Sequence, residues 1–249
     1  MATSFPVNFH YRTAFPFQRS VQGYIRSDLV VPIRYRGLSI KFRPFSYDPL
    51  VLYSILVRRV YGEIPSGWSV VDIGAHIGVF SLYSLLSGAE RVLAYEPEER
   101  NFELLRENVK ANDVGGRIQA LKLAVWSDDE QRTLFTSRGT AFHGFFPDRL
   151  HAGGSERVDC VGINTLLDRV NYPVLLKIDA EGSEYEIVNA ITEENMQKVG
   201  RICAECHVGT PRLRPLYPTL LQQLRSRGFS ISTHSGKRIV IAFRAGGIS

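Results

Sequence analysis

Residues 70–80 have the types and spacing of a ligand-binding loop. Asp72 ends an apolar run, and Gly74 and Gly78 follow it four residues apart. Glycine permits a tight turn and lets a ligand approach backbone N–H groups closely. A strand, a glycine loop and a helix in this order form a pocket for a nucleotide-like ligand in α/β proteins. The stretch therefore predicts such a pocket.

The glycine spacing narrows the type of ligand. A dinucleotide fingerprint has a middle glycine that lets a pyrophosphate touch the backbone, and this chain has Ala75 and His76 there. No Gly-Lys-Ser/Thr phosphate loop occurs. Glu96 ends the next apolar run, where a carboxylate accepts the hydroxyls of a ribose, although Glu96 alone could also be a helix N-terminal acid. The pattern favours a nucleoside-containing ligand without a pyrophosphate.

A second group of polar side chains follows two later apolar runs. These residues are Lys177, Asp179 and Glu181 after the first run, and Glu205 and His207 after the second. Alternate residues of a strand share a face, and the carboxyl ends of parallel strands meet at one sheet edge, so we expect this group to converge. Each residue alone could have a purely structural role: Glu181 or Glu184 could cap the following helix, and His207 could be a hydrogen-bonded histidine of the core. Asp179 is the hardest to explain by packing.

Alternating apolar runs and amphipathic segments must position these groups. Strands are predicted at Val70–Ile73, Arg91–Tyr95, Ile118–Val125, Val174–Asp179 and Val199–His207, helices at Val79–Ser87, Glu98–Asn112, Asn164–Val170, Ser183–Ile191 and Leu216–Arg227, and short strands at Gln131–Phe135 and Glu156–Gly162. Phe229–Thr233 and Arg238–Phe243 read as a terminal hairpin. This order predicts an α/β fold with a doubly wound, mostly parallel sheet and an antiparallel C-terminal edge hairpin.

Two regions lie outside that alternation. Residues 1–66 form a predicted N-terminal extension that packs on the core, with strands at Val30–Tyr35 and Leu38–Phe42 and a helix over Asp48–Tyr61. Residues 67–249 form the main domain. Within it, residues 136–155 have no clear periodicity, and they predict either a mobile surface loop or a lid over a ligand. The lid is favoured because the loop carries Phe142, Phe145 and Phe146.

The composition is that of an ordinary globular protein. Of 249 residues, 44% are hydrophobic and 22% charged, and no run is long and apolar enough to predict a membrane span. No signal peptide is visible, and three cysteines are an odd, low number, so we expect a reducing, cytoplasmic location. The net charge of +5 indicates either an anionic partner or, as we favour, general solubility. Nothing in the pattern predicts an oligomeric state.

Four motifs together resemble the FkbM family of S-adenosylmethionine-dependent methyltransferases. They are Asp-Ile-Gly-Ala-His-Ile-Gly from Asp72, Tyr-Glu-Pro at Glu96, Leu-Leu-Lys-Ile-Asp-Ala-Glu-Gly-Ser-Glu around Asp179, and Ala-Glu-Cys-His ending at His207. The resemblance implies a seven-stranded, Rossmann-like class I methyltransferase fold and S-adenosyl-L-methionine as cofactor. The cofactor-binding residues it implies are Asp72, Gly74, Ala75, His76, Gly78, Glu96, Pro97, Ala124, Val125 and Asp179, with a softer assignment for Ser127 and Asp128.

The same resemblance implies methyl transfer to an acceptor framed by His207, Asp179, Glu205, Glu181 and Lys177. Most of the rate should come from alignment, with a general base second. His207 is the first choice for that base because its usual pKa lies near neutrality, and Asp179 is the second. Three carboxylates and a histidine could also bind a divalent cation, but salt bridges would equally relieve their repulsion, and no metal site is assigned. The expected acceptor is a hydroxyl of a small molecule, sugar, glycolipid or natural product.

Two alternatives stay open. An RNA methyltransferase is suggested by the pI of about 9.2 and the unexplained first 66 residues. Against it, the site after the fourth core strand reads Asp179-Ala-Glu-Gly rather than the Asn/Asp-Pro-Pro-aromatic of amino-methylating enzymes, and no Pro-Cys dipeptide occurs. A non-catalytic module that keeps the cofactor fold is less favoured, because Asp72, Glu96 and Asp179 are all present.

Overall fold

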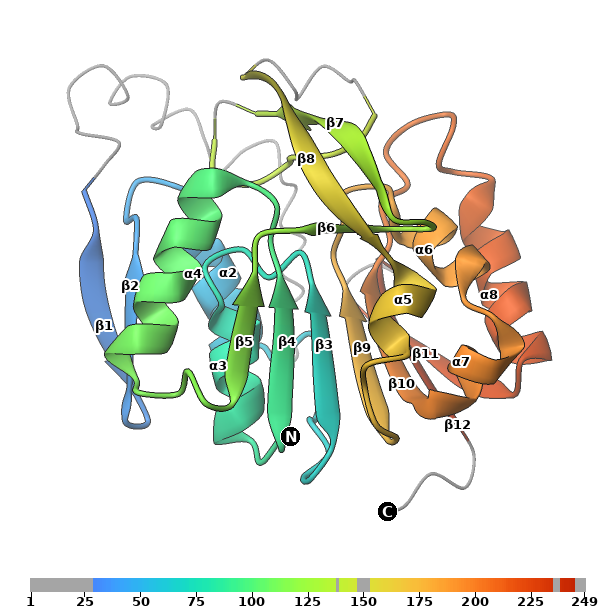
Figure 1. The fold of residues 1–249 in the computed structure, drawn as a ribbon, viewed down its shortest axis with the longest axis horizontal. Helices are drawn as coiled ribbons and strands as arrows, with labels where there is room; N and C mark the ends of the chain where they lie inside the picture. Colours follow the sequence, from blue (N-terminus) through green and yellow to red (C-terminus); the bar gives the residue numbers. More distant parts are fainter. Residues whose placement is uncertain (1–28, 138, 147–152, 235–237, 245–249) are drawn as a thin grey trace, which may run out of the picture.

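The computed structural model describes residues 29–137, 139–146, 153–234 and 238–244, and its centre is a seven-stranded sheet (Figure 1). The strand order is β11-β12-β10-β9-β3-β4-β5. Their bounds are Ser69–Ile73 (β3), Arg91–Tyr95 (β4), Ile118–Leu121 (β5), Val174–Ile178 (β9), Val199–Glu205 (β10), Phe229–His234 (β11) and Ile239–Arg244 (β12). Neighbours pair in parallel except where β12 takes part. The predicted fold class is confirmed; within the edge hairpin, β12 is the antiparallel strand and β11 forms the edge.

Helices cover both faces of this sheet because neighbouring residues of its buried strands point in opposite directions. Val70 belongs to one apolar cluster and Val71 to another. The first cluster includes residues of α3 (Val79–Leu86) and α4 (Glu99–Ala111), and the second includes residues of α5 (Ile163–Leu167), α6 (Glu184–Ala190), α7 (Glu193–Lys198) and α8 (Leu216–Ser226). Helix α7 was not predicted, although the Thr192 hydroxyl that accepts from Asn195 N is a recognisable N-cap.

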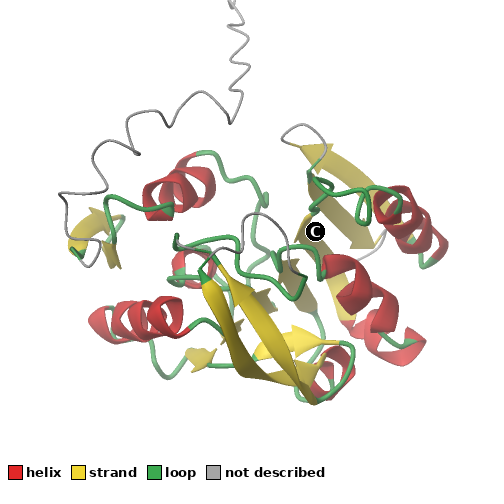
Figure 2. Cartoon of the chain, turned by 90° about the horizontal axis from the view of Figure 1, so that it is seen from above, coloured by secondary structure: helices red, strands yellow, loops and turns green. Residues whose placement is uncertain are grey.

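A smaller three-stranded sheet lies over the carboxyl ends of the main strands (Figures 1 and 2). It contains β6 (Ala124–Trp126), β7 (Glu130–Thr136) and β8 (Gly154–Gly162), in the order β6-β8-β7. The single strand predicted over Ile118–Val125 was wrong: β5 pairs with β4 in the main sheet, whereas β6 pairs with β8. The chain therefore changes sheets between Leu121 and Ala124, and carries β6 across the edge where ligands bind in open α/β folds.

The described part of the predicted extension, residues 29–66, is called the N-terminal segment below. It contains β1 (Val31–Tyr35), β2 (Leu38–Phe42), α2 (Asp48–Leu52) and a π-helical turn η1 (Tyr53–Val57). The hairpin around Arg36 and Gly37 is confirmed, with φ of 46° and 90° at those residues. The helix expected over Asp48–Tyr61 ends early, because Arg59 and Gly62 both take positive φ.

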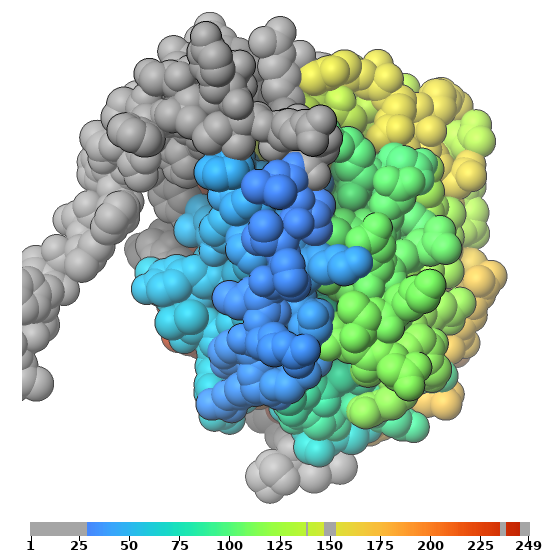
Figure 3. Space-filling model, turned by 90° about the vertical axis from the view of Figure 1, so that its left-hand side faces the viewer, coloured from blue at the N-terminus to red at the C-terminus, as the bar shows by residue number. Residues whose placement is uncertain are grey.

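The N-terminal segment lies against α4 (Figure 3, blue and green), and two asparagines of that helix bond to its backbone. Asn108 accepts from Lys41 N at 2.7 Å and donates to Lys41 O at 3.0 Å. Asn112 makes the same pair of bonds with Ser39, both at 2.8 Å. Apolar side chains such as Ile55 and Tyr61 join the same cluster as α3 and α4.

Three stretches on which predictions fall lie outside the described residues. These are residues 1–28 of the extension, residues 138 and 147–152 of the predicted lid, and residues 235–237 of the terminal hairpin. Within the stretches that are described, no helix has both the length and the apolar character needed to cross a bilayer.

Candidate active site

The glycine loop forms the tight turn that its sequence predicts. Gly74 and Gly78 have φ of 73° and 82°, in the left-handed region that disfavours other residues. A Cβ added to Gly74 would overlap the backbone carbonyl oxygen of Asp179, and one added to Gly78 would overlap the side chain of Leu105. Gly74 therefore lets the end of β3 lie directly against the residue that follows β9.

Glu96 holds this loop through its backbone. Its buried carboxylate accepts from His76 N at 2.8 Å and from Glu98 N at 2.9 Å, one bond to each oxygen. Burial raises the pKa of Glu96 to about 7, against the opposing effect of those two donors. Each carboxylate oxygen keeps a further lone pair for a ligand hydroxyl. Pro97, the next residue, is half-buried.

Asp72 and Lys177 form a buried ion pair at the base of the glycine loop. They face each other across β3 and β9, with the Lys177 Nζ 3.1 Å from Asp72 and both residues buried. Lys177 also donates to the carbonyl oxygens of Ile73 and Gly74, and the Ser81 hydroxyl donates to Asp72 at 2.6 Å. Burial alone would lower the pKa of Lys177, but the Asp72 carboxylate holds it above its usual value. These contacts make the pair a support for the glycine loop.

The residues expected near an adenine lie at the start of the small sheet. Ala124 and Val125 are buried in β6, Ala124 in the cluster of the small sheet and Val125 in the main core. Ser127 and Asp128 follow β6, and the Ser127 hydroxyl donates to the Asp128 carboxylate at 2.9 Å. Nothing in these contacts points either residue at a ligand.

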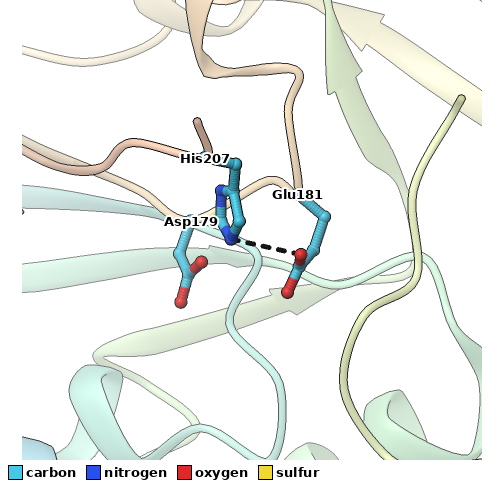
Figure 4. A group of neighbouring side chains, drawn as sticks. All are labelled: Asp179, Glu181 and His207. Atoms are coloured by element: carbon cyan, nitrogen blue, oxygen red, sulfur yellow. Dashed lines mark ion pairs between the residues drawn. The ribbon is translucent and has the colours of Figure 1, made fainter. Parts of the chain in front are cut away.

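The second predicted group does converge after β9 and β10. Asp179, Glu181 and His207 each offer a nitrogen or oxygen within 4.8 Å of the others (Figure 4). His207 Nε2 lies 3.1 Å from Glu181 Oε2. These three residues are the group of possible metal ligands that the described chain brings together. The ion pair uses the same imidazole nitrogen that a cation would need, so the two arrangements are alternatives.

His207 is held between two glutamates. Its Nδ1 lies 3.3 Å from Glu184 Oε1, which also accepts from His207 N at 2.6 Å, while the other Glu184 oxygen accepts from Gly182 N. Burial alone would lower the pKa of His207, but Glu181 and Glu184 raise it well above its usual value. These two glutamates therefore favour the imidazolium form of His207, whose Nε2 pairs with Glu181 and whose Nδ1 lies near Glu184 without a hydrogen bond.

Glu205 is the carboxylate of this cluster for which the described residues supply no hydrogen-bond donor. Burial, followed by the nearby Asp179 carboxylate, raises its pKa to about 7. Asp179 is different, because its Oδ2 accepts from the Tyr61 hydroxyl at 3.1 Å and lies 4.0 Å from Lys177 Nζ. Tyr61 comes from the N-terminal segment and was missed in the sequence, where no motif surrounds it.

The described part of the predicted lid contacts residues around the site through its aromatic rings. The Phe146 ring has the Arg212 guanidinium 3.2 Å from its centre, and Phe145 packs on Trp126 with ring centres 5.4 Å apart. Phe142 packs on Tyr47 of the N-terminal segment. Arg212 follows β10 in the connection that also carries His207, so the loop contacts both the N-terminal segment and this connection.

The sheet order, the glycine loop and the acidic residue after the second core strand define a class I methyltransferase fold. Residues 72–231 match the Methyltransferase FkbM domain. The chain therefore belongs to the FkbM methyltransferase family, and the expected family and the methyltransferase class of enzyme are confirmed.

Known proteins agree with this membership. The chain is 27% identical over 203 residues to methyltransferase sdnD of Sordaria araneosa, covering 68% of this chain and 76% of that protein. It is 27% identical over 180 residues to the 31-O-demethyl-FK506 methyltransferase FkbM of Streptomyces tacrolimicus, covering 58% and 67%. The crystal structure of methyltransferase FkbM from Methylobacillus flagellatus shares the fold, with a TM-score of 0.50 and 19% identity, over 77% of this chain and 47% of that one.

Proposed function

We propose that this protein uses S-adenosyl-L-methionine to methylate a hydroxyl group of a small molecule, a sugar or glycolipid, or a natural product. The observation that carries the proposal is the direct contact between the glycine loop and the acidic cluster, where a Cβ on Gly74 would overlap the Asp179 carbonyl. A donor bound on the loop and an acceptor bound at the cluster would meet at that contact. Family membership supports the same reaction class.

The residues of the loop fit the cofactor. Gly74 and Gly78 let the loop turn tightly against Asp179 and Leu105, and Glu96 keeps lone pairs for the two ribose hydroxyls. When bound, S-adenosyl-L-methionine supplies an electrophilic methyl group on a positively charged sulfur. Asp72 and Lys177 support the loop from beneath, so we assign them a positioning role.

Glu205 is a better proton acceptor than His207, our first choice from sequence. Glu181 and Glu184 favour the imidazolium form of His207, which pairs with Glu181 through Nε2 and in that form balances part of the negative charge of the cluster. Glu205 has a pKa of about 7 and no donor among the described residues, so its Oε is free to take the acceptor proton. The acceptor hydroxyl would donate its single hydrogen bond to Glu205, and the charge of Asp179, which is fixed by Tyr61, helps to raise the pKa of that base. Such a base contributes roughly 10²–10⁴-fold to the rate.

The charge of the cluster favours an uncharged acceptor. Four carboxylates, from Asp179, Glu181, Glu184 and Glu205, face one imidazolium and the Lys177 ammonium, so a phosphodiester would meet net repulsion. This argues against the RNA alternative. The name of the Streptomyces relative, 31-O-demethyl-FK506 methyltransferase FkbM, describes methylation at an oxygen, which is the kind of acceptor atom that we propose.

Calorimetry and methyl transfer test the proposal. The wild type should bind S-adenosylhomocysteine, and Glu96→Ala should lose that affinity while Glu194→Gln, on the exposed side of α7, keeps it. Labelled methyl from S-adenosyl-L-methionine should appear on a hydroxyl in a panel that contains 31-O-demethyl-FK506, methyl glucoside and tRNA. Absence of affinity for S-adenosylhomocysteine, or transfer to tRNA alone, would overturn the proposal. We also propose a reducing, cytoplasmic compartment, supported by three buried, free cysteines.

A further inference from the structure

Five polar residues from four separate parts of the chain form a closed ring beside the glycine loop. The ring consists of Arg43 and Asp48 of the N-terminal segment, His76 of the glycine loop, Asn101 of α4 and Thr140 of the predicted lid. In the order Arg43, Asp48, His76, Thr140 and Asn101, each residue contacts the next, and Asn101 contacts Arg43. We call this group the polar ring.

The first half of the polar ring is a buried ion pair. Arg43 donates to the Asp48 carboxylate through Nε at 2.9 Å, Nη2 at 3.1 Å and its backbone N at 2.8 Å. Arg43 is 5% exposed and Asp48 is fully buried. Arg43 Nη2 also donates to Asn101 Oδ1 at 2.7 Å. Burying such charges costs free energy that apolar side chains would not, so the pair contributes defined geometry more than net stability.

The remaining contacts of the polar ring converge on the backbone carbonyl oxygen of Thr140. Thr140 O accepts from Asn101 Nδ2 at 3.1 Å and contacts His76 Nε2 at 2.8 Å. His76 Nε2 also lies 3.4 Å from Asp48 Oδ1, which closes the ring. Because a carbonyl oxygen only accepts, Nε2 carries the hydrogen, and both of its neighbours are acceptors. The imidazole is therefore fixed in one tautomer and one orientation.

The backbone of the same histidine reaches the cofactor pocket. His76 has φ of 52°, which is unusual for a residue with a side chain, and its N–H donates to Glu96 Oε2 at 2.8 Å. The ring holds the side chain on one side of the loop while the N–H orients the Glu96 carboxylate on the other. Movement of the imidazole would rotate this peptide and move the donor away from Glu96.

We infer that the polar ring is a positioning unit of the cofactor pocket, through which Arg43 and Asp48 of the N-terminal segment set the affinity for the cofactor. This inference rests on the proposed function. Arg43 and Asp48 do not reach the ligand; they act through His76 and Glu96. The N-terminal segment, which the family match does not include, is then part of the binding site.

A matched pair of variants at His76 isolates the hydrogen bond. Glutamine can present an amide N–H near the position of imidazole Nε2, and methionine has a similar length with no donor. His76→Met should weaken binding of S-adenosylhomocysteine roughly 5- to 150-fold, the range of a typical coupling between sites, and Asp48→Asn should do the same. His76→Gln should stay close to the wild type. Calorimetry at a temperature where every variant is folded measures these affinities.

The control removes a different contact of the same segment. Asn112→Leu loses two hydrogen bonds to Ser39 and leaves the polar ring intact, so it should lower stability without changing the affinity of the folded protein. Amide hydrogen exchange gives an independent readout in the absence of ligand. The His76 N–H should exchange faster in His76→Met than in His76→Gln or Asn112→Leu.

The outcomes separate the two proposals. A wild type that does not bind S-adenosylhomocysteine overturns the proposed function, and the inference with it. A wild type that binds, together with His76→Met binding equally tightly, overturns the inference alone. Equal losses of affinity in His76→Met and Asn112→Leu also overturn it, because they would reflect general loosening of the segment. Loss in His76→Met and Asp48→Asn with recovery in His76→Gln supports it.

Discussion

Replacing Gly74 by alanine should destabilise the fold and remove cofactor binding. The left-handed φ of 73° costs a residue with a Cβ about 1–2 kcal/mol. The new Cβ would also overlap the Asp179 carbonyl, and forcing such an atom into a packed site costs about 1–3 kcal/mol. The sum is roughly 2–5 kcal/mol of unfolding free energy, and the ends of β3 and β9 must separate to accommodate the methyl group.

Two other glycines provide controls that separate the backbone strain from the overlap with the Asp179 carbonyl. Gly67 has φ of 77°, and a Cβ there meets no atom of the described chain within 4 Å, so Gly67→Ala should cost only the backbone strain. Gly115 has the same open surroundings without a positive φ, so Gly115→Ala should be neutral or stabilising by about 0.4–1 kcal/mol. The difference between Gly74→Ala and Gly67→Ala isolates the contact with Asp179.

Urea denaturation of the three variants and of the wild type gives the unfolding free energies, and calorimetry with S-adenosylhomocysteine gives the affinities. We expect Gly74→Ala to show the largest loss in the first measurement and no binding in the second. If Gly74→Ala costs no more than Gly67→Ala, the glycine loop does not abut the acidic cluster, and the argument for adjacent donor and acceptor sites fails.

Four further predictions concern protons, packing and metals. Glu181→Gln should lower the pKa of His207 in an imidazole ¹⁵N NMR titration, because Glu181 is its closest carboxylate; an unchanged midpoint would contradict the ion pair. Because burial raises the pKa of Glu96 from 4.5 to about 7, its stabilising contribution is complete below pH 4.5 and lost by pH 7, and Glu96→Gln should flatten the stability profile over that interval. Tyr61→Phe should cost about 1 kcal/mol in urea denaturation, whereas Tyr172→Phe, at an exposed ring, should cost nothing measurable. Chelation with EDTA should leave methyl transfer unchanged, since the Glu181–His207 ion pair occupies the possible cation ligands; loss of transfer that Mg²⁺ restores would assign a cation instead.

Local patterns sufficed to predict most of the main sheet. Val70 to Ile73 and Val174 to Ile178 are short apolar runs next to glycine or acidic residues, and such runs identify buried strands without any knowledge of their neighbours. The change of sheet after Leu121 was beyond this reasoning, because β6 is defined by its pairing with the distant β8. Strand order and sheet membership are properties of pairing, and one sequence contains no direct record of pairing.

The residues of the candidate site also divide into those that local sequence patterns identify and those whose role depends on pairing with distant residues. Gly74, Glu96, Asp179 and His207 were identifiable because each stands at the end of an apolar run, and strand ends of a parallel sheet converge. The support that Lys177 gives to Asp72 depends on cross-strand register, which the sequence does not specify.

Tyr61 and the polar ring were invisible for a related reason. Their partners lie far away in the sequence; Tyr61 and Asp179, for example, are 118 positions apart. The N-terminal segment carries no recognisable motif, so only the folded chain shows that it reaches the site.

The asparagine pairs on α4 also act as a molecular ruler. Asn108 and Asn112 are one helical turn apart, a rise of about 6 Å, and the alternate residues Ser39 and Lys41 of β2 are separated by nearly the same length. A slip of β2 by one residue would turn its free N–H and C=O groups away from both carboxamides. The helix thus substitutes for a neighbouring strand: it closes an edge that could recruit another chain, and it admits the N-terminal segment in a single register.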